Sequence, residues 1–132
     1  MKVSQNILDY QSELSDADAE IGTAIIKLIA NALPKAEGKV WHGHPVWFID
    51  GNPVVGYSLK KAGIEVLFWS GQSFKLEGLR AIGKFKAAGI AVPTIKDLNK
   101  KSMTVWLAEA VAIQWDYQNL PKKRALNKLT KF

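Results

Sequence analysis

Two histidines in one short segment are the residues of this chain best suited to bind a ligand. His42 and His44 lie two positions apart, between Trp41 and Pro45. If the segment is extended, both imidazole rings lie on the same face and could share one metal ion or one anion. Gly43 between them and Pro45 after them favour a bend instead, which would aim the rings apart. The sequence leaves both geometries open, and it identifies no third ligand for a metal ion.

Five carboxylates within the first twenty residues form a second candidate site, because hard iron ions are held well by oxygen ligands. Asp9 and Glu13 are four residues apart, as are Asp16 and Glu20, so each pair shares a face if its segment is helical. Together with Asp18, these residues are the predicted metal ligands. The alternative is structural, since carboxylates also stabilise the positive end of a helix that starts near them.

Two motif-like segments do not carry the chemistry that they resemble. Residues 78–84 have the glycine and lysine spacing of a phosphate-binding loop, but Phe85 follows where a magnesium-binding Ser or Thr is required. A strand-like segment also follows where a helix should begin. Ser70 and Ser73 lack the flanking glycines of a hydrolase nucleophile. We therefore predict no catalytic residues and expect a non-enzymatic protein.

Composition narrows the classes of protein further. The chain has 132 residues, of which 48% are hydrophobic, and a chain of this size buries about two thirds of its unfolded surface in a single domain. It contains no cysteine, which excludes disulfides, thiolate metal sites and thiol nucleophiles. No apolar segment approaches the ~20 residues of a membrane span, and no hydrophobic signal segment is present. A cytoplasmic protein that does not enter the membrane is expected.

The net charge of +6 is unevenly distributed. Residues 1–33 hold five acids and two bases, so the remainder of the chain carries a charge of +9. The last twelve residues, 121–132, contain five bases and no acid. We therefore divide the chain into one domain, residues 1–120, and a basic tail. The tail could contact nucleic acid or another anionic partner, or it could be a solvated terminus.

Helices are predicted at both ends of the domain. Ser15 followed by acids is typical of a helix start, and Pro34 ends the apolar stripe that follows it. A shorter helix over residues 5–13 is expected to precede it. A final helix is expected from Ser102, where apolar residues recur at helical spacing. The apolar stripes of the two long helices are predicted to be Ile21, Ala24, Ile25, Leu28, Ile29 and Ala32, and Met103, Trp106, Leu107, Ala110, Val111 and Tyr117.

Strands are predicted between these helices, where apolar residues alternate or form short continuous segments. Short loops between consecutive strands imply antiparallel pairing. The expected strands are residues 39–42, 45–49, 53–59, 64–69 and 85–92. The predicted fold is therefore α+β, a two-layer sandwich in which an antiparallel sheet of about five strands has the N-terminal and C-terminal helices on one face.

Aromatic residues on these strands suggest a binding surface. If Trp47, Tyr57 and Trp69 gather on the sheet face away from the helices, they form an exposed aromatic patch, which would be a ligand cleft or a dimer interface. The alternative is that these rings fill the core. The predicted ligand-binding residues are Trp41, His42, His44, Trp47, Tyr57 and Trp69.

The element order and several segments resemble the YdhG-like family of bacterial proteins, from about the first helix to Tyr117. The similarity lies in residues 41–45, in the strand 64–69 that leads into Ser70 and Gly71, and in Gly83 with Lys84. Family members are two-layer proteins related in shape to frataxin-like and YjbR-like folds. At least one is described as an intracellular iron chaperone.

The resemblance implies a small cytoplasmic iron-binding protein, monomeric or homodimeric, that holds iron through the carboxylates of its first helices. This is the first hypothesis for function. The second is a binding module for an organic anion, a nucleic acid or a protein partner, which would use the aromatic sheet face and the basic surface. Nucleic-acid binding would be recognised by a steep loss of affinity with salt.

Overall fold

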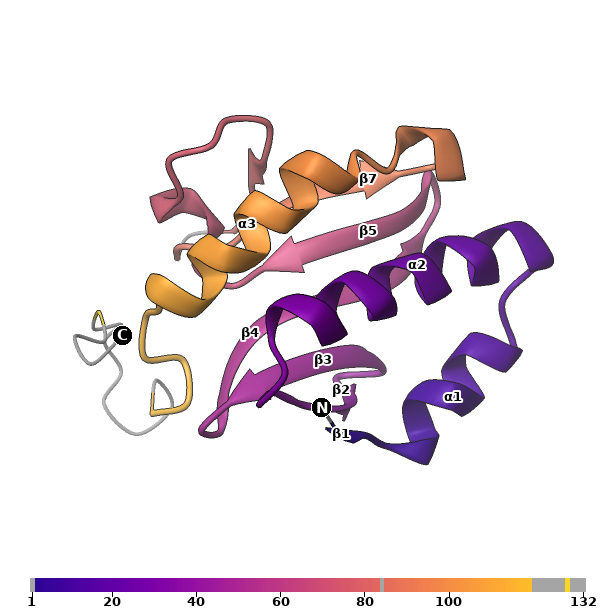
Figure 1. The fold of residues 1–132 in the computed structure, drawn as a ribbon, viewed down its shortest axis with the longest axis horizontal. Helices are drawn as coiled ribbons and strands as arrows, with labels where there is room; N and C mark the ends of the chain where they lie inside the picture. The colour runs from indigo at the N-terminus through magenta and orange to yellow at the C-terminus, as the bar shows by residue number, and fades with distance from the viewer. Residues whose placement is uncertain (1, 84, 120–127, 129–132) are drawn as a thin grey trace.

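Three α-helices cover one face of a seven-stranded sheet in the computed structural model of the chain, which describes residues 2–83, 85–119 and 128 (Figure 1). The helices are α1 (Gln5–Ser12), α2 (Asp16–Ala32) and α3 (Lys100–Ala112), with short 3-10 helices η1 (Gly71–Ser73) and η2 (Ile95–Asp97). The strands are β1 (Lys2–Val3), β2 (Glu37–Trp41), β3 (His44–Ile49), β4 (Asn52–Lys60), β5 (Gly63–Phe68), β6 (Arg80–Ala81) and β7 (Ala88–Val92). The predicted α+β sandwich is confirmed.

The sheet is almost entirely antiparallel, with the strand order β1-β2-β3-β4-β5-β7-β6. Strands β2 to β5 pair consecutively, and β7 pairs with β5. These are the five strands that the sequence predicts. Strands β1 and β6 add two residues each at the edges, and β1 runs parallel to β2. Strands this short show no alternation of apolar residues that could reveal them in the sequence.

Polar side chains set where the long helices begin. The Ser15 side chain accepts a hydrogen bond of 3.2 Å from the backbone N–H of Asp18, which caps α2. Asn99 caps α3 by accepting a 3.0 Å bond from the backbone N–H of Ser102, so this helix begins at Lys100, two residues before the predicted start. The buried face of α2 consists of Ile21, Gly22, Ile25 and Ile29.

Helix α1 is fastened to the sheet by two side-chain hydrogen bonds. The Tyr57 hydroxyl donates to Gln11 Oε1 over 2.7 Å, and the Tyr10 hydroxyl accepts from the backbone N–H of Leu59 over 3.0 Å. Gly22 of α2 makes room for this contact, because a Cβ at that position would collide with the Gln11 side chain. The first two helices and β4 therefore form one packed unit.

Trp47 and Tyr57 lie in the core between the sheet and the helices, with 0% and 1% of their surfaces exposed. Their rings stack with centroids 6.0 Å apart and an interplanar angle of 27°. Gly38, paired with Trp47 in the neighbouring strand, leaves space for the indole, since a Cβ there would lie 2.6 Å from Trp47 Nε1. The expectation that these two rings share the exposed face with Trp69 is therefore wrong, and the alternative of a core position holds.

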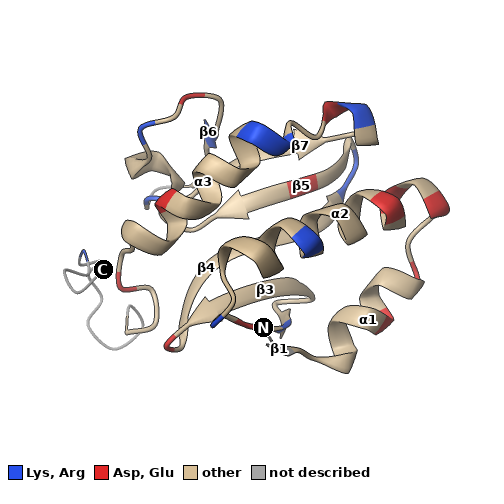
Figure 2. Cartoon of the chain, viewed as in Figure 1, with Lys and Arg blue, Asp and Glu red and all other residues tan. Residues whose placement is uncertain are grey.

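Acidic residues are frequent in the first two helices, although both charges occur throughout the molecule. Figure 2 shows acidic positions on α1 and at the start of α2, at the end of the molecule away from the last described residues. Among the described residues, no helix is both long and apolar enough to cross a membrane. Apart from Lys128, which forms an isolated bridge with Trp115, the predicted basic tail of residues 121–132 lies outside the described residues.

Candidate aromatic groove on the open sheet face

Three aromatic rings gather on the sheet face away from the helices. The Trp41 ring lies with its centroid 5.5 Å from that of Phe48 and 6.2 Å from that of Trp69. Trp69 extends over Gly56 of β4, where a Cβ would lie 3.3 Å from the indole and 2.6 Å from the carbonyl oxygen of Pro45. A glycine at position 56 therefore lets the ring lie close to the strand. We refer to Trp41, Phe48 and Trp69 as the open-face cluster.

Beside this cluster lies a groove of about 390 Å³. It is lined by Trp41 and His42 at the end of β2 and, as a second wall, by Tyr117 and Gln118, which follow α3. Its remaining lining residues are Lys39, Phe48, Gly51 and Pro53. The volume is within the range of small-molecule sites, which is about 300–1,000 Å³. We call it the aromatic groove.

The described residues that line the aromatic groove include a basic side chain and no acidic one. Lys39 Nζ lies 4.7 Å from the centroid of the Phe48 ring, and the His42 ring lies 4.1 Å from that of Trp41. No Asp or Glu is among the lining residues in the described chain. Asp50, in the adjacent turn, instead lines a separate cavity of about 300 Å³ that also contacts Leu33. The aromatic groove thus combines aromatic surface with a lysine and a histidine, a composition suited to an anion.

The two histidines lie at a bend, as Gly43 and Pro45 favour, and not in a continuous extended segment. His42 and Gly43 have positive φ angles of 54° and 83° and form the turn between β2 and β3, which pairs Trp41 with His44. His44 is half-buried, and its Nδ1 is buried with no hydrogen-bond partner among the described residues. Burial lowers the pKa of His44, the backbone at Pro45 opposes this, and the charges of Lys60 and His42 lower it further.

Three of the five acids predicted to bind iron contribute to the helices in the structure. Asp9 accepts a 3.1 Å hydrogen bond from Gln5 within α1, and Asp16 and Asp18 occupy the first turn of α2. Across the described residues, no three His, Asp or Glu side chains lie close enough together to hold a metal ion. The structure therefore does not assemble Asp9, Glu13, Asp16, Asp18 and Glu20 into a metal centre of three ligands.

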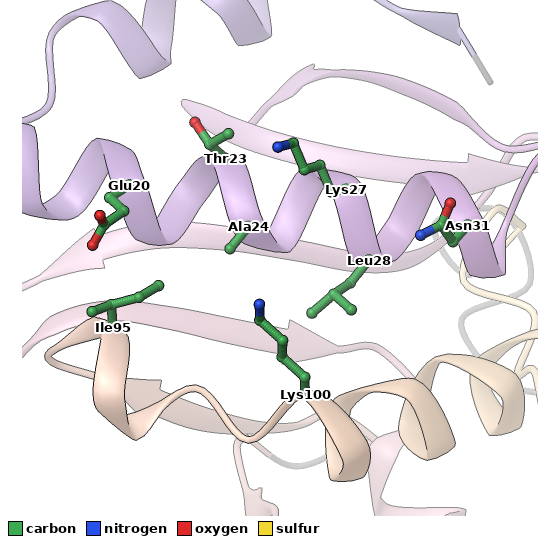
Figure 3. A pocket seen from close by; sticks show the side chains of 8 residues that line it. All are labelled: Glu20, Thr23, Ala24, Lys27, Leu28, Asn31, Ile95 and Lys100. Atoms are coloured by element: carbon green, nitrogen blue, oxygen red, sulfur yellow. The ribbon is translucent and has the colours of Figure 1, made fainter.

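A larger cavity, of about 570 Å³, lies between α2 and the start of α3 (Figure 3). Figure 3 shows Ala24 and Leu28 pointing from α2 toward η2 and α3, with the Lys100 ammonium pointing back toward α2. Its wall has no aromatic ring, and the exposed Glu20 carboxylate accompanies the exposed Lys27 and Lys100. Because its charges are of mixed sign and it has no aromatic surface, this cavity is less suited to a planar anion than the aromatic groove.

Sequence reasoning found Trp41, His42 and Trp69 but missed most of the groove. Lys39 and Phe48 could have been included, since the paired strands β2 and β3 place them on the same face as Trp41. The apolar spacing that assigns Tyr117 to the last helix is misleading, because α3 ends at Ala112. Tyr117 and Gln118 lie in irregular backbone after it and reach the groove only through tertiary contacts, which no spacing in the sequence predicts.

A scan against models of protein families, a search of curated proteins and a search of solved structures each found no match for this chain. The resemblance to the YdhG-like family therefore stays a prediction from the residues and adds no ligand to the site. What the groove binds has to be argued from its own geometry.

Proposed function

We propose that this chain is a non-enzymatic binding protein whose aromatic groove takes a small planar organic anion. The observation that supports this is the position of Lys39 Nζ, 4.7 Å from the Phe48 ring, beside Trp41 in a groove lined by no carboxylate. A flat ring can pack against the indole while its anionic group approaches the ammonium. The described residues that line the groove include no Ser, Thr or Cys that could act as a nucleophile.

Aromatic packing and charge contribute in different ways. Contact between two rings adds about 0.5–1.5 kcal/mol beyond the area that is buried. A charge contact at a partly exposed site is worth about 1 kcal/mol or less. The ring should therefore supply most of the affinity, while Lys39 and His42 select anions over neutral molecules of the same shape. The iron hypothesis has less support, because the described acids form no group of three ligands.

The proposal is tested by calorimetric titration with three matched probes. The probe 2-naphthoate is a planar aromatic anion, 2-naphthalenemethanol is its neutral counterpart, and cyclohexanecarboxylate is an anion without an aromatic ring. We expect saturable binding of 2-naphthoate, weaker binding of the alcohol and the weakest binding of cyclohexanecarboxylate. Equal affinity for the acid and the alcohol, or no saturable heat with any probe, would overturn the proposal.

A titration with a single-stranded oligonucleotide separates this function from nucleic-acid binding. Nucleic-acid affinity falls steeply with salt because several counterions are released, whereas a single charge contact gives only a shallow dependence. We expect the affinity for 2-naphthoate to change little between low and moderate salt. A steep salt dependence seen only with the oligonucleotide, without 2-naphthoate binding, would favour the nucleic-acid alternative.

A further inference from the structure

The second wall of the aromatic groove belongs to residues 114–118, which we call the strap. The strap follows α3 and contains no helix. We propose that Asn52 is a positioning residue that holds the strap in place as the recognition wall of the groove. This inference rests on the proposed function, because it assigns a role in ligand binding to residues outside the open-face cluster.

Asn52 is the centre of the attachment. It is the first residue of β4 and is 3% exposed. Its side-chain NH2 group donates to Gln114 Oε1 over 3.1 Å and to the carbonyl oxygen of Trp115 over 2.9 Å. Its Oδ1 accepts a 3.0 Å bond from the backbone N–H of Gln118. One amide thus binds both ends of the strap, using two donors and an acceptor that only Asn or Gln offers together.

Further hydrogen bonds fix the middle of the strap. Ser70 Oγ accepts from the backbone N–H of Trp115 over 3.0 Å, and Ser73 Oγ accepts from the Trp115 indole N–H over 3.0 Å. The hydroxyl of Tyr117 accepts a 3.0 Å bond from the backbone N–H of Lys86. These partners all lie in the segment that connects β5 with β7, so the strap is bonded to this connection as well as to β4.

The turn before Asn52 is shaped to receive the strap. Gly51 has a φ of 82°, a conformation that favours glycine, and a Cβ there would collide with the side-chain amide of Gln118. Gln118 therefore lies directly against this turn, and both residues line the groove. Because Gly51 has no side chain, the Gln118 amide can pack directly against the backbone of the turn.

Polar contacts make up most of the attachment of this wall. Tyr117 is half-buried and packs edge-on against Phe85, with ring centroids 6.5 Å apart, whereas Gln118 is exposed and is held by hydrogen bonding. If the Asn52 bonds are lost, the wall can move away from Trp41, and a bound ring keeps its packing on one side only. The phenol and amide of the strap would then no longer contribute to affinity.

The test compares two variants of the full chain. Asn52→Asp keeps the size of the side chain and its acceptor but removes both donors. Glu109→Ala is the matched control, because Glu109 accepts bonds of 2.7 Å and 3.3 Å from the backbone N–H groups of Lys75 and Leu76, which do not line the groove. Both variants should lower the free energy of unfolding. Only Asn52→Asp should weaken the binding of both 2-naphthoate and the neutral 2-naphthalenemethanol, by about tenfold for the loss of one or two hydrogen bonds. A loss confined to 2-naphthoate would follow from repulsion by the new carboxylate and would overturn the role of the strap.

Amide hydrogen exchange supplies a readout that general destabilisation would not reproduce. In Asn52→Asp, exchange should accelerate at Trp115 and Gln118 while the core strands stay protected, and 2-naphthoate should slow exchange at these amides in the unsubstituted protein. If Asn52→Asp does not fold, Ser70→Ala, which removes a single strap bond, should show a smaller effect of the same kind, about threefold in affinity.

The outcomes separate the two proposals. If the unsubstituted protein does not bind 2-naphthoate, the proposed function fails and this inference fails with it. If the unsubstituted protein binds 2-naphthoate and a variant with faster exchange at Trp115 and Gln118 binds it equally well, only the role of the strap is overturned. Equal loss of affinity in Asn52→Asp and Glu109→Ala would also overturn it, because the effect would then follow from stability alone.

Discussion

The ammonium group of Lys39 lies 4.7 Å from the centroid of the Phe48 ring, on the sheet face that the helices leave open. The two residues belong to neighbouring strands, and this contact places a positive charge at the edge of an aromatic surface. Three further residues, Trp41, Gly56 and Asn52, determine whether that edge can hold a ligand. The first two predictions concern this surface.

Replacing Lys39 by glutamine should weaken 2-naphthoate binding by about fivefold, because the charge contact between a partly exposed ammonium and the ligand carboxylate contributes up to about 1 kcal/mol. Lys39→Arg keeps the charge and should retain most of the affinity. Lys61→Gln is the control, since Lys61 lies in the turn at the opposite end of β4 from the groove. Calorimetric titration measures all three, and an equal loss in the control would show a nonspecific charge effect.

Substitution of Gly56 by alanine should damage both the fold and the groove. The added methyl group would lie 2.6 Å from the Pro45 carbonyl oxygen and 3.3 Å from the Trp69 ring, so backbone or indole must shift, at a cost of about 1–3 kcal/mol. Gly43→Ala is the comparison: its Cβ meets nothing within 4 Å, and only its φ of 83° is unfavourable, costing about 1–2 kcal/mol. Only Gly56→Ala should also change the tryptophan fluorescence of the folded protein.

His44 should make the protein less stable in mild acid. Burial lowers its pKa below the usual 6.5, so the unfolded chain takes up a proton at a higher pH than the folded protein does. The free energy of unfolding should therefore be constant above about pH 7.5 and decrease as the pH falls below 6.5. Urea denaturation of the wild type and of His44→Gln across this range measures the effect. An identical pH dependence in the variant would contradict it.

Tyr57 should have the opposite pH dependence, at alkaline pH. Burial, and to a smaller extent Tyr10, raise the pKa of its phenol, so the unfolded chain ionises first as the pH rises. The contribution of the Tyr57 phenol to the free energy of unfolding is complete below about pH 10 and decreases as the pH rises above it. Tyr57→Phe removes this dependence and also the 2.7 Å bond to Gln11, which should cost about 1–2 kcal/mol at neutral pH. Burial also raises the pKa of Tyr117, so Tyr117→Phe should remove a separate part of the same alkaline dependence when both variants are compared with the wild type by urea denaturation.

The acidic residues in the first turn of α2 provide a test of the resemblance to iron-binding proteins. Asp16 and Asp18 lie in the first turn of α2, where they stabilise the helix. Replacing both by their amides should lower the free energy of unfolding by about 0.5–1.5 kcal/mol in total and leave anaerobic calorimetry with ferrous iron unchanged. A saturable heat in the wild type that disappears in the variant would restore the iron hypothesis.

The helices and the main strands could be predicted because their signals are local. Ser15 and Pro34 mark the ends of α2, and apolar spacing marks its buried face. The face on which Trp47 lies could not be predicted in the same way. Val46, Trp47 and Phe48 are all apolar and all buried, so alternation does not distinguish the two faces of β3.

The groove was harder to predict because its second wall depends on distant partners. Asn52 bonds to residues 62 to 66 positions later in the chain, and no short segment contains both partners. The positive φ of His42 was likewise not evident from its own residue type. Gly43 and Pro45 indicated a bend there, yet its backbone angles depend on the hairpin that forms around it.

The hydrogen bonds that attach the strap determine how far the chain must extend for the domain to keep its buried contacts. The end of α3 at Ala112 looks like a natural boundary, because the regular secondary structure stops there. Ending the chain at that helix would leave the Asn52 amide and the Ser70 hydroxyl, both now buried, without the partners that residues 114–118 supply. Fusion proteins, shortened versions and circular permutants should therefore keep the chain intact at least through Asn119, even though these residues belong to no helix or strand.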